Sequence, residues 1–235
     1  MWGTAAGSVL RMGPAPRDPG PAPGAGAPAP VRDVVRLSDD GGSDRVVAYV
    51  ERELPPGGIS AYRATRGDGT RSFALWADEQ RGERLATLVT VSAGSGVARY
   101  QVIGAHGELI GTVVREKALR GKGLRTRWTV MPAGGPAAVG FKGRICWWYV
   151  WWLLSPLQLL VVVLSLLSGD GDAARGPRRI VWRAGGQAPL EFRAKDDAVL
   201  VHAPDYDWRL GAALVAVLGT FDSWLLGTEW DDRKD

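Results

Sequence analysis

The densest cluster of chemically active side chains in this sequence is a run of basic residues near its middle. Six basic residues stand against a single acid, Glu116, and they are Arg115, Lys117, Arg120, Lys122, Arg125 and Arg127. Basic side chains beside a membrane attract anionic headgroups, and each contributes about 1 kcal/mol near the surface. The run therefore predicts a site for lipid headgroups, with an ordinary solvated hairpin as the alternative.

Catalytic chemistry is not indicated by any motif. His106 and His202 are the only histidines, the first in an expected turn and the second at the end of an expected strand. No third partner completes a Ser-His-Asp arrangement with either of them. Neither a G-x-S-x-G motif nor a P-loop is present. We therefore expect no catalytic residue, no metal site and no cofactor, and the sequence leans towards a non-enzymatic protein.

The overall composition narrows the class of partner only a little. The 235 residues carry a net charge of +4, an excess too small to predict nucleic acid as a partner. Cys146 is the only cysteine, so the chain cannot form an internal disulfide. Because it lies inside an apolar segment, we expect its thiol to behave as a small hydrophobic side chain.

That apolar segment, Ile145–Ser168, predicts contact with a membrane. It has no charged residue and contains thirteen Leu, Ile and Val residues. These favour insertion into a bilayer by about 6 kcal/mol, before the smaller costs of its polar residues and of Pro156. Its first half carries the four indoles Trp147, Trp148, Trp151 and Trp152. Indoles prefer the headgroup boundary, so we expect these residues to contact the membrane. A core helix of a soluble protein is the alternative.

A second apolar segment lies near the end of the chain. The pattern predicts a helix from about Asp207 to Leu226, with Asp205 or Asp207 as its N-cap. Residues Leu210–Leu226 are apolar on every side, which is typical of a helix buried inside protein. A second membrane span is the alternative.

Elsewhere, short alternating segments predict β-strands that are separated by glycine- and proline-rich turns. Twelve segments qualify: Val31–Leu37, Arg45–Arg52, Ile59–Arg66, Arg71–Ala77, Glu83–Val91, Val97–Ile103, Glu108–Arg115, Leu124–Met131, Ala137–Lys142, Arg178–Arg183, Ala188–Ala194 and Ala198–His202. Turns at this spacing favour an antiparallel meander or barrel over βαβ units. We expect no helix between Val31 and Val130.

The first thirty residues predict a disordered tail. Residues Gly13–Pro30 carry seven of the fifteen prolines, set among Gly and Ala. Such a tract buries too little apolar surface to offset its loss of conformational entropy. We expect residues 31–229 to form one barrel domain, which includes the hydrophobic insertion 145–168.

The hairpin from Tyr100 to Arg115, which reads Tyr-Gln-Val-Ile-Gly-Ala-His-Gly-Glu-Leu-Ile-Gly-Thr-Val-Val-Arg, resembles a signature of the tubby C-terminal-like superfamily. That superfamily includes the phospholipid scramblases and the LURP-one-related proteins. The strand Arg125-Thr-Arg-Trp-Thr-Val and the ending Asp207-Trp-Arg-Leu to Phe221-Asp222 are similar to later parts of the same pattern.

The resemblance implies a mainly β fold, a closed antiparallel barrel of about twelve strands around a hydrophobic C-terminal helix. It also implies a basic surface that binds phosphoinositides, as in tubby-like proteins. Ile145–Ser168 departs from the family pattern as an inserted hydrophobic helical segment. The chain also lacks the cysteine cluster and calcium-loop pattern of the scramblases, so the resemblance does not extend to lipid scrambling.

A single barrel places both ends of the insertion on one side of the bilayer, because strands that pair cannot be separated by a crossing. We expect the segment to dip into the membrane and return, bending at Ser155-Pro156. Basic residues flank it on both sides: Lys142 and Arg144 before it, and Arg175, Arg178 and Arg179 after it. Such flanks are typical of cytoplasmic ends.

The sequence therefore predicts a non-enzymatic, membrane-associated barrel on the cytoplasmic face, with anionic phospholipid as its partner. Two alternatives remain open. One is a soluble ligand-binding or enzymatic barrel whose interior is not filled by the terminal helix. The other is a small integral membrane protein with one or two true spans.

Overall fold

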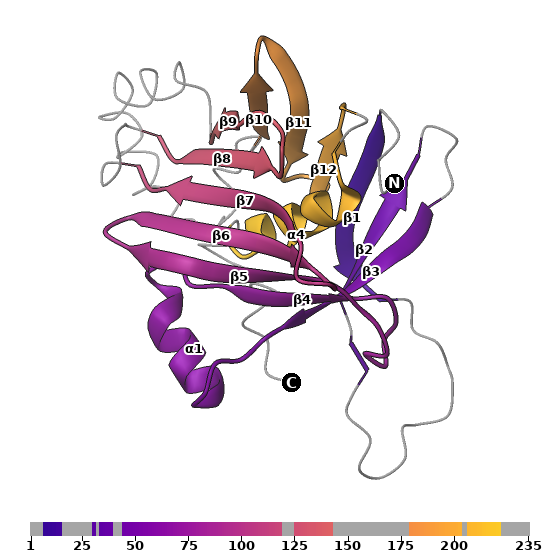
Figure 1. The fold of residues 1–235 in the computed structure, drawn as a ribbon, viewed down its shortest axis with the longest axis vertical. Helices are drawn as coiled ribbons and strands as arrows, with labels where there is room; N and C mark the ends of the chain where they lie inside the picture. Colours follow the sequence, from indigo (N-terminus) through magenta and orange to yellow (C-terminus); the bar gives the residue numbers. More distant parts are fainter. Residues whose placement is uncertain are drawn as a thin grey trace, which may run out of the picture.

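Twelve antiparallel strands close into a barrel (Figure 1). The computed structural model describes residues 7–15, 30–31, 33–39, 44–118, 125–142, 179–203 and 206–221. The strands are β1 Ser8–Pro14, β2 Asp33–Ser38, β3 Asp44–Arg52, β4 Ser72–Trp76, β5 Arg84–Gly94, β6 Val97–Gly104, β7 Leu109–Glu116, β8 Arg127–Pro132, β9 Ala138–Phe141, β10 Arg179–Ala184, β11 Gln187–Arg193 and β12 Ala198–Val201. Each pairs with its neighbours in sequence, and β1 also pairs with β12. The predicted fold class is confirmed.

The strands form because apolar and polar residues alternate along them, and successive side chains point to opposite faces of a sheet. In β6, Ala98, Tyr100 and Val102 are buried towards the interior, while Arg99 and Gln101 between them point outward. The turn that follows contains Gly107 at φ +82°, a left-handed conformation that glycine adopts without strain.

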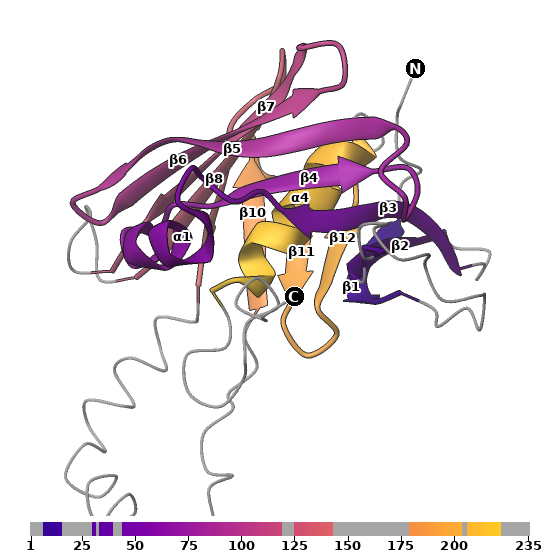
Figure 2. The same ribbon diagram turned by 90° about the horizontal axis from the view of Figure 1, so that it is seen from below.

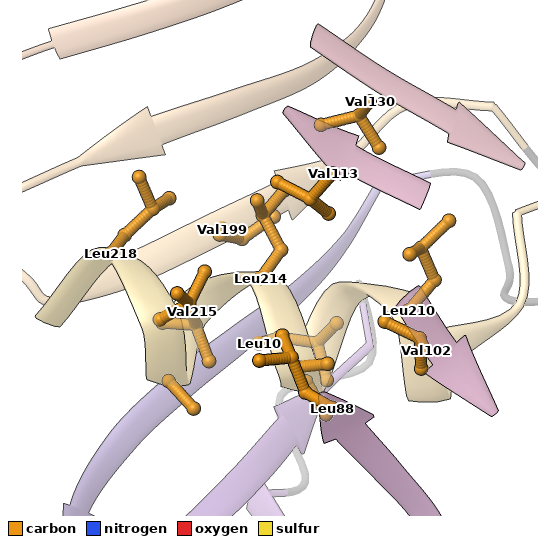
Figure 3. Packing of buried hydrophobic residues seen from close by; sticks show 14 of the residues in the cluster. Leu10, Leu88, Val102, Val113, Val130, Val199, Leu210, Leu214, Val215 and Leu218 are labelled. Atoms are coloured by element: carbon orange, nitrogen blue, oxygen red, sulfur yellow. The ribbon is translucent and has the colours of Figure 1, made fainter. Parts of the chain in front are cut away.

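The helix α4, Trp208–Gly219, fills the interior of the barrel (Figures 1 and 2). It begins at Asp207, whose Oδ1 accepts a hydrogen bond from the backbone N–H of Arg209 at 2.8 Å, so the predicted N-cap is confirmed at Asp207. Every residue from Leu210 to Leu218 is buried. Leu214 lies beside Val113 of β7 and Val199 of β12 in the buried cluster (Figure 3). The prediction of a core helix is confirmed for the described part of Leu210–Leu226.

Two glycines let this helix approach the barrel wall. A Cβ atom on Gly211 would lie 2.4 Å from Cδ1 of Leu10 in β1. A Cβ atom on Gly111 of β7 would lie 2.9 Å from Cδ2 of Leu210. Both distances are far below a van der Waals contact, so the helix and the wall touch at these positions only because a side chain is missing.

Replacing Gly211 with valine is expected to lower the free energy of unfolding by about 3 kcal/mol, because the interior cannot absorb the added volume. Leu10→Ala alone is expected to cost about 2–5 kcal/mol through the cavity that it leaves. In the double variant the valine occupies part of that cavity, so we expect the combined loss to be smaller than the sum by about 1–2 kcal/mol. Denaturant titration of the four proteins measures this coupling, and strictly additive losses would contradict the contact.

Two local predictions were wrong. Residues Ser8–Pro14 form β1 instead of part of a disordered tail, because Ser8 and Leu10 face the interior and the backbone pairs with both β2 and β12. Residues Gly58–Arg66 form the helix α1 instead of a strand. Ile59 and Tyr62 stand at helical spacing, and Tyr62 is the one buried residue of α1. The other predicted strands are confirmed, with ends that differ by up to three residues.

The hydrophobic insertion connects two strands that lie side by side. β9 ends at Phe141 and β10 begins at Arg179, and the two strands pair through Gly140 with Trp182 and Val139 with Arg183. Because β9 and β10 are antiparallel neighbours, the chain leaves and re-enters the barrel at the same end, which we call the insertion end. Ile145–Ser168 itself lies outside the described residues. Among the residues that the structure describes, neither helix has the length and apolarity needed to cross a membrane.

Candidate anion-binding site

Basic side chains gather at the insertion end of the barrel. Strand direction alternates around the barrel, so β3 and β7 end there, and β4 and β8 begin there. α1 connects β3 to β4 and lies at this end, beside the ends of β5 and β6 (Figure 1). α4 also ends there, since Phe221 packs against Trp128 of β8 with ring centroids 5.7 Å apart. Two helix C-termini and several strand ends therefore meet in one place.

Between them lies an open cavity of about 440 Å³. Its lining residues are Arg63 and Arg66 of α1, Gly67 after it, Arg71 before β4, Arg115 and Lys117 at the end of β7, and Phe221. We call this the basic cavity. Five of the seven lining residues are cationic, and none of the seven is acidic. The cavity is open to solvent and lined mainly by charged side chains, unlike the enclosed apolar clefts that hold most small molecules.

Arg71 is held firmly beneath the cavity. It is 3% exposed, and its Nε donates a hydrogen bond to Oγ1 of Thr220 at 2.9 Å. Its Nη1 donates to the carbonyl oxygens of Arg66 and Thr70 at 2.9 and 2.8 Å. Arg71 thus satisfies a carbonyl group at the end of α1 and contacts the residue that caps α4. Its guanidinium also lies 4.4 Å from the centre of the Phe221 ring.

Arg115 is the second cation beneath the cavity and has a different environment. Its guanidinium lies 4.0 Å from the centre of the Phe221 ring and 5.9 Å from that of Trp128. Its Nε is buried and has no hydrogen-bond partner among the described residues. Burial lowers the pKa of Arg115, the charge of Arg71 lowers it further, and only Tyr100 acts in the opposite direction. Two cations are therefore stacked on one phenyl ring.

The floor of the site is held by two hydrogen bonds across the barrel mouth. The hydroxyl of Tyr100 donates to the carbonyl oxygen of Gly69 at 2.6 Å, and burial raises the pKa of Tyr100 to about 12. The hydroxyl is therefore neutral at physiological pH and adds no negative charge. Lys117 donates from Nζ to the carbonyl oxygen of Gly67 at 3.0 Å, which ties the end of β7 to α1.

The structure brings together only part of the predicted basic site. Arg115 and Lys117 line the basic cavity, but Arg125 and Arg127 do not. Arg127 pairs with Glu116 at 3.4 Å, and the guanidinium of Arg125 lies 4.7 Å from the centre of the Phe141 ring. The prediction that these basic residues act as one headgroup-binding set stays a prediction. The following predicted residues lie outside the described residues: Arg120, Lys122, Trp147, Trp148, Trp151, Trp152 and Pro156.

Sequence reasoning missed five residues of the cavity, which are Arg63, Arg66, Gly67, Arg71 and Phe221. The first two were assigned to a strand, in which residues three apart point to opposite faces. On a helix, the same spacing places two side chains on one face. That i, i+3 pair of arginines was the one local signal available for this part of the site.

Two networks of partly buried charges elsewhere in the described residues pair side chains of opposite sign. Glu191 accepts hydrogen bonds from Arg179 at 2.7 Å and from Arg193 at 2.5 Å. Arg209 pairs with Asp207 at 2.8 Å and with Glu108 at 2.9 Å. The lining of the basic cavity, by contrast, contains no acidic residue.

Neither histidine lines the basic cavity. His106 lies in the turn between β6 and β7, and His202 is exposed after β12. In the part of the chain that the structure describes, no three His, Cys, Asp or Glu residues group as metal ligands. α4 occupies the interior, so the interior is filled by the terminal helix. The alternative of a soluble ligand-binding or enzymatic barrel stays a prediction.

Comparison of the chain with protein-family models, with curated proteins and with solved structures found no match. The basic cavity and the position of the insertion therefore carry the functional argument.

Proposed function

We propose that this chain is a non-enzymatic, membrane-associated barrel that binds anionic phospholipid at its insertion end. One observation carries the proposal: the end of β9 and the start of β10, which the hydrophobic insertion connects in sequence, lie at the same end of the barrel as the basic cavity. If Ile145–Ser168 enters a bilayer, Lys142, which stands only three residues before it in the sequence, brings that end to the headgroups. Basic residues there gain about 1 kcal/mol each from an anionic surface.

The resemblance to the tubby C-terminal-like superfamily supports the same proposal. The twelve-stranded barrel closed around a C-terminal helix is the architecture that the resemblance implies. We propose membership of that superfamily, with the insertion between β9 and β10 as the feature that distinguishes this chain. The cytoplasmic face follows from the basic residues on both flanks, because such residues stay on the cytoplasmic side.

Flotation of the full-length protein with vesicles tests the proposal. We expect binding to phosphatidylcholine vesicles, and binding about tenfold stronger when phosphatidylserine is included. The additional binding is electrostatic, so raising the salt concentration should remove it and leave the binding to neutral vesicles unchanged. Equal binding to neutral and anionic vesicles would contradict the role of anionic lipid. A protein that ignores both kinds of vesicle would contradict the membrane role itself.

A further inference from the structure

The last described residue of the chain, Phe221, lies in the wall of the basic cavity. α4 ends at Gly219, and the backbone N–H of Phe221 donates to the carbonyl oxygen of Leu218 at 3.0 Å. The guanidinium groups of Arg71 and Arg115 lie 4.4 and 4.0 Å from the centre of the Phe221 ring, so backbone and side chain are both held in place. The residues that follow in the sequence therefore start at the cavity.

Those residues carry the opposite charge to the cavity lining. Residues 222–235 contain five acids and two bases, whereas the lining contains five cations and no acid. Three of the acids, Glu229, Asp231 and Asp232, surround Trp230 in a run of four residues, 229–232, which we call the acidic segment. Carboxylates match the paired N–H donors of guanidinium groups, and an indole ring stacks on a guanidinium. The acidic segment therefore complements the lining in charge and in the type of side chain.

The connection between Phe221 and the acidic segment is long enough to bring the segment back over the cavity. Glu229 stands eight residues after Phe221, and an extended chain covers up to about 3.3 Å per residue, or about 26 Å in all. Exposed ion pairs are individually weak. A short tether nevertheless holds the segment at an effective concentration in the millimolar range, so the contact needs no high intrinsic affinity. A contact of this strength is one that a charged bilayer can displace.

We propose that the acidic segment of the chain docks in its own basic cavity, and that it leaves the cavity when an anionic bilayer competes for the same cations. The segment thereby restrains the attraction of the insertion end to anionic lipid until a membrane is near. The release step rests on the proposed function, because anionic lipid is the competitor. The docked contact does not, because it forms within one chain in the absence of a membrane.

Cross-linking of the full-length monomer in detergent-free buffer tests the docked contact. A carbodiimide joins a carboxylate to an amine that touches it, and one water is lost as the amide bond forms. Lys117 lines the cavity, so we expect mass spectrometry to find its Nζ linked to Asp231 or Asp232. Lys195 is an exposed amine between β11 and β12 at the same end of the barrel, does not line the cavity, and should give no such link. High salt should abolish the Lys117 link. Absence of that link, or equal linking of Lys195, would overturn the inference.

Flotation with phosphatidylserine vesicles tests the release. Asp231→Asn with Asp232→Asn neutralises the acidic segment, and Asp68→Asn with Asp196→Asn removes equal charge from exposed residues at the same end of the barrel. We expect the first variant to bind about fivefold more tightly than the second, as for a cavity that the segment occupies about four-fifths of the time. Binding to phosphatidylcholine vesicles should be equal.

A cavity variant separates docking from simple repulsion between the acidic segment and the membrane. Arg63→Ala with Arg66→Ala removes two exposed or partly exposed cations of the lining. In that background, neutralising the acidic segment should give no gain over the matched control, because the two changes remove one interaction. A gain that persists there, or no gain in the original background, would overturn the inference and leave the proposed function intact. A Lys117 link in a protein that ignores all vesicles would support the docked contact and contradict the proposed function.

Discussion

A chain in which residues 143–179 are replaced by Asn-Gly is expected to fold into the same barrel and to lose its affinity for membranes. The pairs Gly140–Trp182 and Val139–Arg183 place Lys142 opposite Ile180 when the register is continued. A two-residue Asn-Gly turn joins two antiparallel strands at this separation without disturbing the register. The ladder between β9 and β10 keeps both of its pairs, and the interior around α4 is unchanged.

The expected loss of membrane affinity is large. The thirteen Leu, Ile and Val residues of Ile145–Ser168 favour insertion by about 6 kcal/mol, which corresponds to about four orders of magnitude in the partition coefficient. The basic cavity remains and gives only a salt-sensitive attraction to anionic vesicles. Flotation measures the first effect, and thermal unfolding in detergent-free buffer measures whether the barrel is intact.

A second variant separates the contribution of the indoles to membrane binding from that of the length of the segment. Changing Trp147, Trp148, Trp151 and Trp152 to serine keeps the segment but removes the side chains that prefer the headgroup boundary. We expect intermediate binding. An unfolded Asn-Gly variant would mean that the insertion belongs to the core of the barrel. An Asn-Gly variant that binds neutral vesicles as well as the unchanged protein would show that another surface meets the membrane.

The parts of the fold that could be predicted from the sequence are those in which local pattern and tertiary structure agree. The β6–β7 hairpin is an example, since alternation fixes the inward faces and Gly107 supplies the turn. α4 is another. A helix that is apolar on every side needs an apolar environment all round, and a barrel closed around it provides one.

The errors arise where a partner distant in sequence decides the local structure. β1 contains Gly13 and Pro14 and has few apolar residues, so its own pattern resembles a tail. It is a strand because β2 and β12 lie on both sides and pair with it, and β12 is about 190 residues away along the chain. The burial of Tyr62 in α1 likewise depends on residues outside the helix. The guanidinium of Arg52 in β3 lies 5.6 Å from the centre of its ring.

The candidate site could also be predicted only in part from the sequence. Side-chain direction alternates along a strand, so in β7 Arg115 faces the barrel mouth and Glu116 points outward. Glu116 stands opposite Arg127 of β8, which therefore also points outward. A run that looks like one basic patch in the sequence is thus divided between two surfaces. Arg115 is instead joined by arginines of α1 and of the start of β4, and the topology, not the sequence run, brings these together.

Arg115→Met is expected to weaken binding to phosphatidylserine vesicles without lowering the stability of the barrel. Binding should weaken about fivefold, because one cation near an anionic surface contributes about 1 kcal/mol. Methionine has similar length and keeps the packing on Phe221 and Trp128, apart from the cation–π contribution.

The expected stability of Arg115→Met depends on the sign of the pKa shift of Arg115. Burial lowers that pKa. Wherever Arg115 is charged in both the folded and the unfolded state, its charge therefore lowers the free energy of unfolding. Removing the charge therefore removes an unfavourable term. We expect the free energy of unfolding without ligand to stay within about 1 kcal/mol of its original value or to rise. A residue kept only for stability would show the opposite change.

Two further variants make this result decisive. Arg127→Met removes an equal charge that is already paired with Glu116, so a smaller loss of binding to phosphatidylserine vesicles is expected. Arg115→Lys keeps the charge, so binding close to that of the unchanged protein is expected. If Arg115→Met instead lowers the free energy of unfolding by about 3 kcal/mol and retains binding to phosphatidylserine vesicles, Arg115 supports the end of α4 and has no role in binding. The two roles thus predict opposite changes in the same two measurements, because a buried guanidinium kept to bind an anionic surface costs stability and one that supports the fold contributes to it.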